Sequence, residues 1–488
     1  MNILDSLIGF VSPAAAVRRW QARQALELVR GYEGAKRSRR TAGWNTPSTS
    51  ANAENVMALP VLRNRSRDLV RNNPWVKKAI GNWVDDAIGT GIRLGLGNKD
   101  AGGVAWHEFA ESTACDADGL SDLYGLQALA ARTMWESGAV IIRRRWRRLS
   151  DGLPVPLQLQ VLEADFLDHG KTCETKTGYI IGGVEFNKLG QRIAYWLFDQ
   201  HPGEAMQMGV VATSRAIPAD DVIYAFKRLR PGQVHGVPEL APVIMRARDL
   251  DDYEDAELTR KKIEACFSVF VTSDSGGGSG MGDIGKDGKG QPTERVSPGM
   301  IKRLKPGEEV SFGQPTPTSG YAEYLRAGHR AMAAGAGQTY EQMTGDLSQV
   351  NYASSRAGML PYRRSVEAWQ WLVFVPMVCQ RIIGWFNEAA DLAGKPRIPA
   401  GTEWTTPRFE WVDPVKDMKG ELLKVAAGVQ SFSELQRRLG QQPGKVLEEL
   451  KADWQKLRDA GIPISLDGLV ALLLTPDATD QPDAKQPA

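Results

Sequence analysis

The chain has 488 residues, 42% of them apolar and 24% charged, and its 60 Lys and Arg against 58 Asp and Glu give a formal net charge of +2. No run of about 18 apolar residues occurs, which argues against a membrane-spanning helix, and we expect no membrane partner. The four cysteines are scattered and form no CxxC pair, which argues against a disulfide framework and a zinc site.

Charge is distributed unevenly along the chain. Residues 1–80 contain fourteen Lys or Arg and five Asp or Glu, an excess of nine positive charges, whereas 249–257 contain six carboxylates and no base. This separation favours contact with a polyanion at one place and repulsion at another. We expect residues 1–59 to form a basic arm. A solvated, flexible arm without a polyanionic partner is the alternative interpretation.

Residues 60–236 are expected to form a mixed domain. Its first part predicts two helices that break at Asn73-Pro74. From Trp135 to Phe226 the pattern changes to short β runs, such as "GAVIIRRRW" and "RIAYWLF", separated by Gly, Pro and Asp turns. With the helices that follow, these strands predict an α+β fold that is mainly helical.

A long helix is expected over 237–270, with Pro238 in its first turn and an apolar stripe of Ile244, Ala247, Leu250 and Leu258. Thirty helical residues make a rod of about 45 Å. Residues 271–318 predict a compact strand-and-turn module that carries a flexible Gly-rich insertion, and 319–343 predict a returning helix. Paired rods with exposed apolar stripes must bury them against neighbours, which predicts oligomerisation.

The stretch "TGDLSQVNYASSRAG" interrupts the most helical part of the chain. We expect a polar loop over 344–355, followed by a long helix within 356–412. Small helices are predicted behind Asp413-Pro414, Ser431 and Gln442-Pro443 within 413–465. Residues 466–488 are expected to be a disordered tail.

Motifs for catalysis are weak. Gly170-Lys171-Thr172 resembles the end of a phosphate-binding loop, but Asp165 stands where that loop needs Gly. The carboxylates of 249–257 occupy consecutive positions of one predicted helix rather than separate elements, which favours a solvated or channel-facing surface over a metal site. The five histidines show no metal-ligand spacing. We therefore expect no catalytic residue, metal or cofactor. A metal-dependent nuclease or packaging ATPase is the alternative.

The strand "IIRRRWRRL" is strongly basic. Alternation places Arg143, Arg145 and Arg147 on one side and Arg144, Trp146 and Arg148 on the other. Either side can contact phosphates or an acidic surface of a neighbouring subunit, and the sequence does not separate the two.

The ordered set "NNPWVKKAIGNWVDDAIGTGIRL", "LQLQVLEADFL", "GVPELAPVIMRARDLDDYEDAELTRKKIEACF", "YEQMTGDLSQVNYASSRAGML" and "WVDPVKDMKGE" resembles the portal proteins of lambda-type tailed bacteriophages. The resemblance implies a ring, usually of twelve subunits, at one vertex of the capsid, through which double-stranded DNA enters and leaves. It also implies a wing (60–236 and 356–412), a stem (237–270 and 319–343), a clip (271–318), a tunnel loop (344–355) and a crown (413–465).

On this resemblance, the protein belongs to the virion and is assembled in the host cytoplasm. Its implied partners are its own copies, the terminase large subunit, scaffold and major capsid protein, and head-completion or adaptor proteins. A monomeric DNA-binding adaptor that uses the basic arm is a further alternative. The residues proposed for the DNA channel form three sets: Asp346, Leu347, Ser348, Gln349, Val350, Asn351, Tyr352, Ser354, Ser355 and Arg356 in the tunnel loop; Asp249, Asp252, Asp255 and Glu257 on an acidic stem face; and Lys302, Arg303 and Lys305 in the clip.

Overall fold

The computed structural model divides the chain into two compact units, Met1–Ser50 and Ala51–Ala488. It describes residues 14–15, 17–18, 21, 39–44, 46–97, 100–207, 209, 211–265, 269–273, 283–286, 292–295, 308–312, 320–409 and 413–461. The first unit contains a short 3-10 helix, η2 (Arg39–Thr41). None of the described helices is both long enough and apolar enough to cross a membrane.

The second unit begins with two helices, α3 (Ala51–Asn72) and α4 (Pro74–Ala87). The predicted break between them is confirmed. The side chain of Asn73 caps α4 by accepting a hydrogen bond from the backbone N–H of Val76 (2.9 Å), and Pro74 occupies the first helical position. The arm, however, ends earlier than predicted, because α3 already begins at Ala51 rather than near residue 60.

The predicted α+β organisation is confirmed by two antiparallel sheets. In the first, β2 (Ala139–Trp146) lies between β3 (Leu157–Glu163) and β9 (Val222–Phe226). The second has the order β4 (Cys173–Glu174), β5 (Gly178–Ile181), β6 (Val184–Asn187), β7 (Arg192–Phe198) and β8 (Ser214–Pro218), and α7 (Pro202–Gln207) lies between β7 and β8 in sequence. Helices α5 (Gly103–Ala110) and α6 (Leu123–Ser137) precede the strands, and β1 (Arg93–Leu94) pairs with β14 (Trp404–Thr405).

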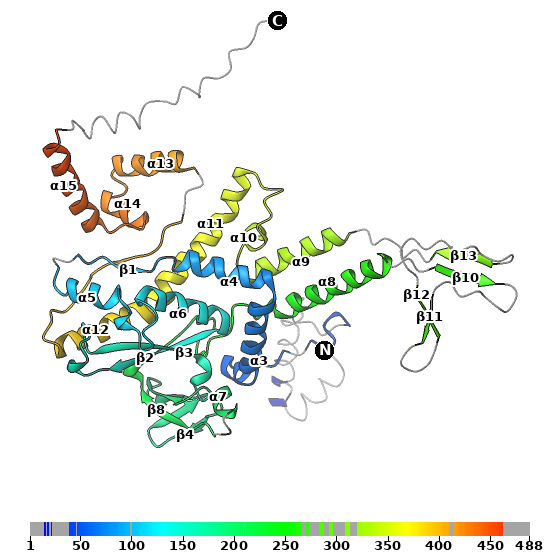
Figure 1. Cartoon of the computed structure of the whole chain (residues 1–488). Helices are drawn as coiled ribbons and strands as arrows, with labels where there is room; N and C mark the ends of the chain where they lie inside the picture. Colours follow the sequence, from blue (N-terminus) through cyan, green and yellow to red (C-terminus); the bar gives the residue numbers. More distant parts are fainter. Residues whose placement is uncertain are drawn as a thin grey trace, which may run out of the picture. The chain divides into compact units, whose positions relative to one another are not determined.

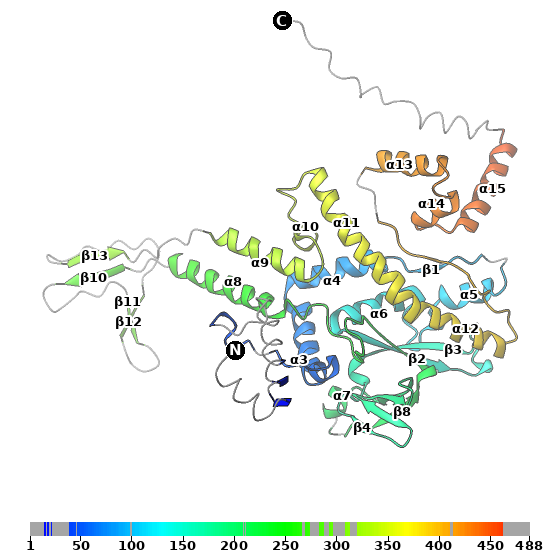
Figure 2. The same ribbon diagram turned by 180° about the vertical axis from the view of Figure 1, so that it is seen from behind.

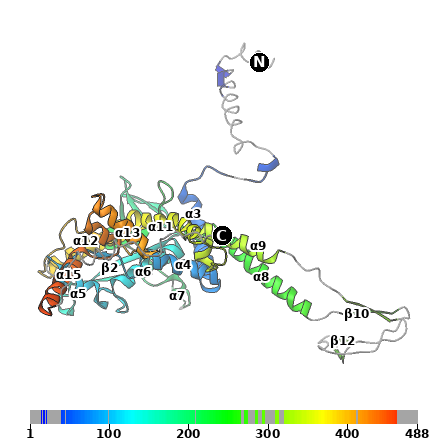
Figure 3. The ribbon, with the colours of Figure 1, turned by 90° about the horizontal axis from the view of Figure 1, so that it is seen from above.

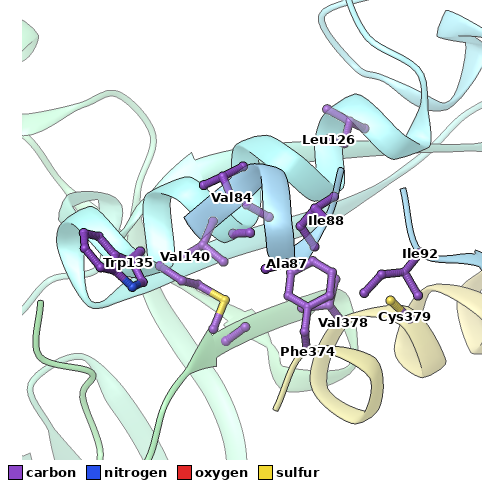
Figure 4. Close-up of a cluster of buried hydrophobic side chains, with 14 of the residues drawn as sticks. Val84, Ala87, Ile88, Ile92, Leu126, Trp135, Val140, Phe374, Val378 and Cys379 are labelled. Atoms are coloured by element: carbon purple, nitrogen blue, oxygen red, sulfur yellow. The ribbon is translucent and has the colours of Figure 1, made fainter. Parts of the chain in front are cut away.

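The main core lies where α4 and α6 meet the first sheet and the segment that follows the tunnel loop. That segment is one long helical run: α11 (Tyr352–Trp369), the π-helical η7 (Gln370–Cys379) and α12 (Gln380–Leu392). Figure 4 shows Ala87 of α4 and the next residue, Ile88, with Phe374 and Val378 of η7 in one buried cluster. The ring of Trp83 packs on that of Trp369, with centroids 4.5 Å apart. The core thus joins segments almost 300 residues apart in sequence.

Helices α8 (Ile244–Ala265) and α9 (Tyr321–Gly335) lie side by side, as Figure 1 and Figure 2 show and as Figure 3 shows from above. Gly328 permits the close approach, because a Cβ there would lie 2.6 Å from a methyl carbon of Leu250. Of the predicted stripe, Ile244, Ala247 and Leu250 are buried within this chain, whereas Leu258 is 51% exposed.

The start predicted for the first rod was also wrong. Helix α8 begins at Ile244 and ends at Ala265, whereas 237–270 was expected. Residues 239–243 form turns, and the backbone N–H of Glu239 donates to the carbonyl of Trp135 (3.2 Å) in α6. This contact with a distant element holds the chain around Pro238 outside the helix.

The clip contains two described strand pairs. Strand β10 (Val269–Ser273) pairs with β13 (Glu308–Phe312), and β11 (Asp283–Lys286) pairs with β12 (Pro292–Arg295). The second pair corrects the sequence prediction, because it lies within the segment expected to be flexible throughout. The basic clip residues Lys302, Arg303 and Lys305 lie outside the described residues.

The crown contains α13 (Pro414–Ala426), α14 (Phe432–Arg438) and α15 (Pro443–Asp459). All three predicted starts are confirmed. The side chain of Asp413 caps α13 by accepting from Lys416 N (3.1 Å), and that of Ser431 caps α14 by accepting from Glu434 N (3.0 Å). The tail predicted over 466–488 lies outside the described residues.

Candidate nucleic-acid interface

The tunnel loop is shorter than predicted. Helix α10 (Tyr340–Thr344) precedes it and α11 follows it, so the loop covers 345–351 rather than 344–355. A capping box starts α10: the Thr339 hydroxyl accepts from Gln342 N (3.2 Å), and the Gln342 side chain accepts from Thr339 N (3.1 Å). Gly345 ends α10 with φ of 76°, a left-handed conformation that glycine adopts without strain.

The carboxylate of Asp346 is hydrogen-bonded to groups of the loop and of α10. Its carboxylate accepts hydrogen bonds from the Tyr340 hydroxyl (3.0 Å) and from the backbone N–H of Ser348 (3.0 Å). Hydrogen bonds from Ser348, then that from Tyr340, hold the pKa of Asp346 below its ordinary value. Asp346 therefore stays ionised and shapes the loop, while Leu347, Ser348 and Gln349 are exposed at its tip.

The last predicted loop residues belong to a helix start. Asn351 caps α11 by accepting from Ser354 N (2.8 Å), and the Ser354 hydroxyl accepts from Asn351 N (3.1 Å). Tyr352, Ser354, Ser355 and Arg356 thus lie in the first turns of α11 and not in a loop. Arg356 forms an ion pair with Asp417 of α13 (2.8 Å).

Three cations surround the base of the loop: Lys78 of α4 and Arg326 and Arg330 of α9, here called the loop collar. The Lys78 ammonium lies against Gly345, 2.5 Å from where a Cβ would stand. The charge of Arg326 also lowers the pKa of Asp346, and the Arg330 guanidinium lies 5.6 Å from the centre of the Tyr340 ring. Lys78 and Arg330 are exposed, whereas Arg326 is half-buried. Sequence reasoning missed this set, because only folding brings the two helices to the loop.

The acidic stem residues separate into two groups. Asp249, Asp252 and Asp255 are exposed on α8, and Asp252 pairs with Arg248 (3.0 Å). Glu257 is only 7% exposed, and a hydrogen bond from Arg260 lowers its pKa, so it does not belong to a free acidic face.

A fifth carboxylate of this helix, Asp251, has a structural role. It accepts a hydrogen bond from the side-chain amide of Asn73 (2.7 Å), the residue that caps α4. The stem helix is thereby joined to the break between α3 and α4.

Within the described residues, the one group of three side chains close enough to share a metal ion is Glu163, Asp165 and His201. The guanidinium of Arg67 already lies among these carboxylates, 2.5 Å from Asp165 and 3.1 Å from Glu163. Burial alone would raise the pKa of Asp165, but its hydrogen bond and ion pair with Arg67 hold that pKa below its ordinary value. The two carboxylates of this group are therefore paired with Arg67 in a salt-bridge network.

The residues weighed for phosphate chemistry have other contacts. The Lys171 ammonium lies 3.3 Å from the centre of the Trp196 ring, and the Thr172 hydroxyl accepts from the backbone N–H of Gly182 (3.0 Å). On the basic strand, Arg144 forms ion pairs with Asp221 and Glu388 of the same chain (2.5 Å each). The structure thus gives Arg144 an intramolecular role that neither sequence interpretation included.

Sequence comparison finds similarity to portal proteins of phages. The model of a family described as "Phage portal protein, lambda family" matches residues 37–370. The probable portal protein of Halomonas phage phiHAP-1 is 25% identical over 473 residues, which cover 91% of this chain and 89% of that protein. Portal protein B of Escherichia phage lambda is 22% identical over 493 residues, which cover 88% and 89%. A chain from the neck of a native GTA particle is 15% identical with a TM-score of 0.45, covering 77% of this chain and 93% of its own.

Proposed function

The chain belongs to the lambda family of phage portal proteins, and from this premise we propose that its loop over 345–351 contacts double-stranded DNA passing through a ring of identical subunits. The protein is a portal protein, and its place is the portal vertex of the virion. The proposed role is structural: it positions and guides DNA and requires no catalytic residue, metal or cofactor.

The observation that carries the proposal is the chemistry of the loop. The one carboxylate within 345–351, that of Asp346, is engaged internally, so the exposed tip offers Leu347, Ser348 and Gln349, which are uncharged. Each phosphate neutralised by a cation strengthens binding. A neutral tip can therefore touch moving DNA without holding it, while the loop collar at its base supplies the attraction.

The dimensions of the proposed ring are compatible with a duplex. Twelve helices about 10 Å apart around a circle give a circumference near 120 Å and a diameter of about 38 Å. One helix radius on each side, about 5 Å, leaves an opening of roughly 28 Å. The exposed carboxylates Asp249, Asp252 and Asp255 would repel phosphates wherever they face this opening.

The remaining partners follow from the same role. The clip would dock the terminase large subunit during packaging and head-completion or adaptor proteins afterwards. Scaffold and major capsid protein would hold the ring at its vertex. These assignments rest on the family and on the order of the segments along the chain.

The first test is the mass of the purified protein in solution. A ring of twelve subunits of 53.5 kDa has a mass of about 640 kDa. A particle that remains a monomer under all assembly conditions, or a ring too narrow for a duplex, would contradict the proposal.

The second test removes the loop tip without disturbing its ends. Deletion of Leu347–Val350 leaves Gly345 and the Asn351 cap in place, so rings should still assemble, but packaging or retention of DNA should be lost. The matched control is Ser431→Ala, which removes the cap of α14 outside the loop, weakens that helix start by about 1 kcal/mol and leaves the tip intact. Normal packaging by rings that lack the tip would contradict the assignment.

A further test addresses the collar. Lys78→Ala should weaken DNA binding by the ring and reduce the slope of log K against log salt by about 0.9. Lys188→Ala, at an exposed position in the turn between β6 and β7, is the control and should leave the slope unchanged. An unchanged slope in Lys78→Ala would remove Lys78 from the interface.

A further inference from the structure

The two sides of β2 differ in how their arginines are partnered. On one side, Arg144 forms ion pairs with two carboxylates of the same chain. On the other side, Arg143, Arg145 and Arg147 follow one another along the strand, and they are here called the arginine row. Within the part of the chain that the structure describes, none of these three forms an ion pair with a carboxylate. The row therefore keeps its positive charge.

Neutral side chains of the neighbouring strand β3 hold two members of the row in place. The Nε of Arg145 donates to the side-chain oxygen of Gln160 (2.9 Å), and the Nε of Arg147 donates to that of Gln158 (2.7 Å). The amide nitrogen of Gln158 donates in turn to the backbone carbonyl of Asp116 (2.9 Å), which leaves its oxygen for Arg147. An amide positions a guanidinium without cancelling its charge, and the terminal N–H groups remain for a further acceptor.

The other charges near the row do not neutralise it. Asp199 lies near Arg143 and Arg145, but it pairs with Arg215 (2.5 Å), which brings a positive charge of its own to this surface. Burial, then the charges of Arg145 and Arg215, lowers the pKa of Arg143. Burial, then the charges of Arg147 and Arg215, lowers the pKa of Arg145. Like charges held this close repel one another, so an anion bound among them would relieve the repulsion.

The spacing of the row matches that of phosphates in DNA. Side chains two positions apart on one side of an antiparallel strand are about 6.8 Å apart. Successive phosphates of one B-DNA strand rise about 3.4 Å and turn by about 36°, which on a helix about 20 Å wide separates them by about 7 Å. The carboxylates exposed on α8 match less well, because Asp249, Asp252 and Asp255 are separated by a rise of about 4.5 Å each. Charge and spacing thus favour a DNA strand over the acidic face of a second copy.

We propose that the arginine row is a second DNA contact, which binds successive phosphates of one strand of double-stranded DNA through its guanidinium groups. The base of the loop over 345–351 is contacted by α4, α9 and α10, none of which carries the row, so the two contacts are separate. Phosphates carry no sequence information, and binding at the row is therefore independent of base sequence.

The test is the affinity of the full chain for a fluorescein-labelled duplex of about 20 bp and arbitrary sequence, measured by anisotropy between about 50 and 200 mM salt. The double variant Arg145→Gln, Arg147→Gln removes two phosphate contacts. It should reduce the slope of log K against log salt by about 1.8 and weaken binding at about 0.1 M salt roughly tenfold or more. Arg145→Lys with Arg147→Lys keeps both charges and should keep the slope.

The matched control is Arg144→Gln, which makes the same charge change on the same strand but on the side that is already paired. Lys188→Gln is a second control at an exposed position away from the row. Both should leave the slope unchanged. Urea midpoints and mass measurement verify that all variants compared are folded and have the same oligomeric state.

An unchanged slope in the folded double Gln variant would overturn the proposal, and so would an equal fall in the two controls, which would indicate net charge rather than the row. A changed assembly mass with an unchanged slope would identify an acidic protein surface as the occupant and would also overturn it.

Combination with Lys78→Ala separates the row from the loop collar. If both bind DNA, their effects on the slope add. A fall caused by Lys78→Ala alone would overturn the row and leave the proposed function standing. A fall caused by the row variants alone would support the row and remove Lys78 from the interface.

Discussion

The wing and the crown use similar side chains in opposite ways. In the wing, Trp106 and Phe386 are almost fully buried, with ring centroids 5.1 Å apart. In the crown, Phe432 is 54% exposed and Leu423 is 66% exposed, and no comparable cluster forms among the described residues. The wing therefore buries its apolar side chains against one another, whereas the crown leaves many of its apolar side chains exposed in the single chain.

The largest expected effect comes from removing one aromatic ring in each region. Phe386→Ala should destabilise the wing by about 3–5 kcal/mol, because removal of a buried ring leaves a cavity. Phe432→Ala in the crown should change the free energy of unfolding by about 0.5 kcal/mol or less. Urea unfolding followed by tryptophan fluorescence measures both. Similar losses in the two variants would show that the crown has a core of its own.

The second prediction concerns how the folding stability of the wing depends on pH. The Nε2 of His169 accepts a hydrogen bond from the guanidinium of Arg63 (2.6 Å), and the His169 ring lies 4.9 Å from that of His235. Burial, then the charge of Arg63, lowers the pKa of His169 to about 4 from its ordinary 6.5. The unfolded chain thus takes up a proton between pH 6.5 and 4 that the folded wing does not, so stability falls as pH falls through this range.

The size of that loss is about 3 kcal/mol for His169 alone. The lowered pKa of His235 adds a loss of the same sign. Urea midpoints of the wing should therefore decrease steadily from pH 7 to pH 4, and His169→Gln, which does not titrate, should flatten the curve. A midpoint independent of pH in the unmodified protein would contradict the assigned state of this histidine.

The correct predictions rest mainly on signals between residues that are neighbours in sequence, such as helix caps. Asn73-Pro74, Asp413 and Ser431 mark helix starts correctly, because a cap depends only on the next three residues. The same kind of signal, Asn351 with Ser354, stands after the tunnel loop, but the unbroken polar run from Ser348 to Ser355 hides it and predicts a loop. Attention to this pair would have placed the start of α11.

Contacts between distant elements were beyond the sequence. The start of α8 depends on the bond between Glu239 and Trp135, and the loop collar needs α4 and α9 to meet at Gly345. The burial of Arg63 cannot be predicted from the sequence, because nothing in its neighbours along the chain indicates it. The pattern of carboxylates along α8 likewise does not predict that Glu257 is buried while Asp252 is exposed.

The smallest expected effect on stability concerns an ion pair between the wing and the crown. The ion pair between Arg356 and Asp417 joins the first turns of α11 to the first turn of α13 (2.8 Å), and the Arg356 side chain is 49% exposed. The Asp417 side chain is only 15% exposed, but the Arg356 end is open to solvent, and a solvent-accessible pair contributes about 0.2–1 kcal/mol. A double-mutant cycle with Arg356→Ala and Asp417→Ala, read by hydrogen exchange in α13, measures the coupling.

A coupling within that range means that the crown can separate from α11 at little cost, so that forces on the tunnel loop, five residues before Arg356 in sequence, need not reach the crown. A coupling of about 2 kcal/mol or more would instead make α11 and α13 one rigid body. The contrast between a wing with a large buried core and a crown with few buried side chains would then weaken, because contacts with the wing would hold the crown in place.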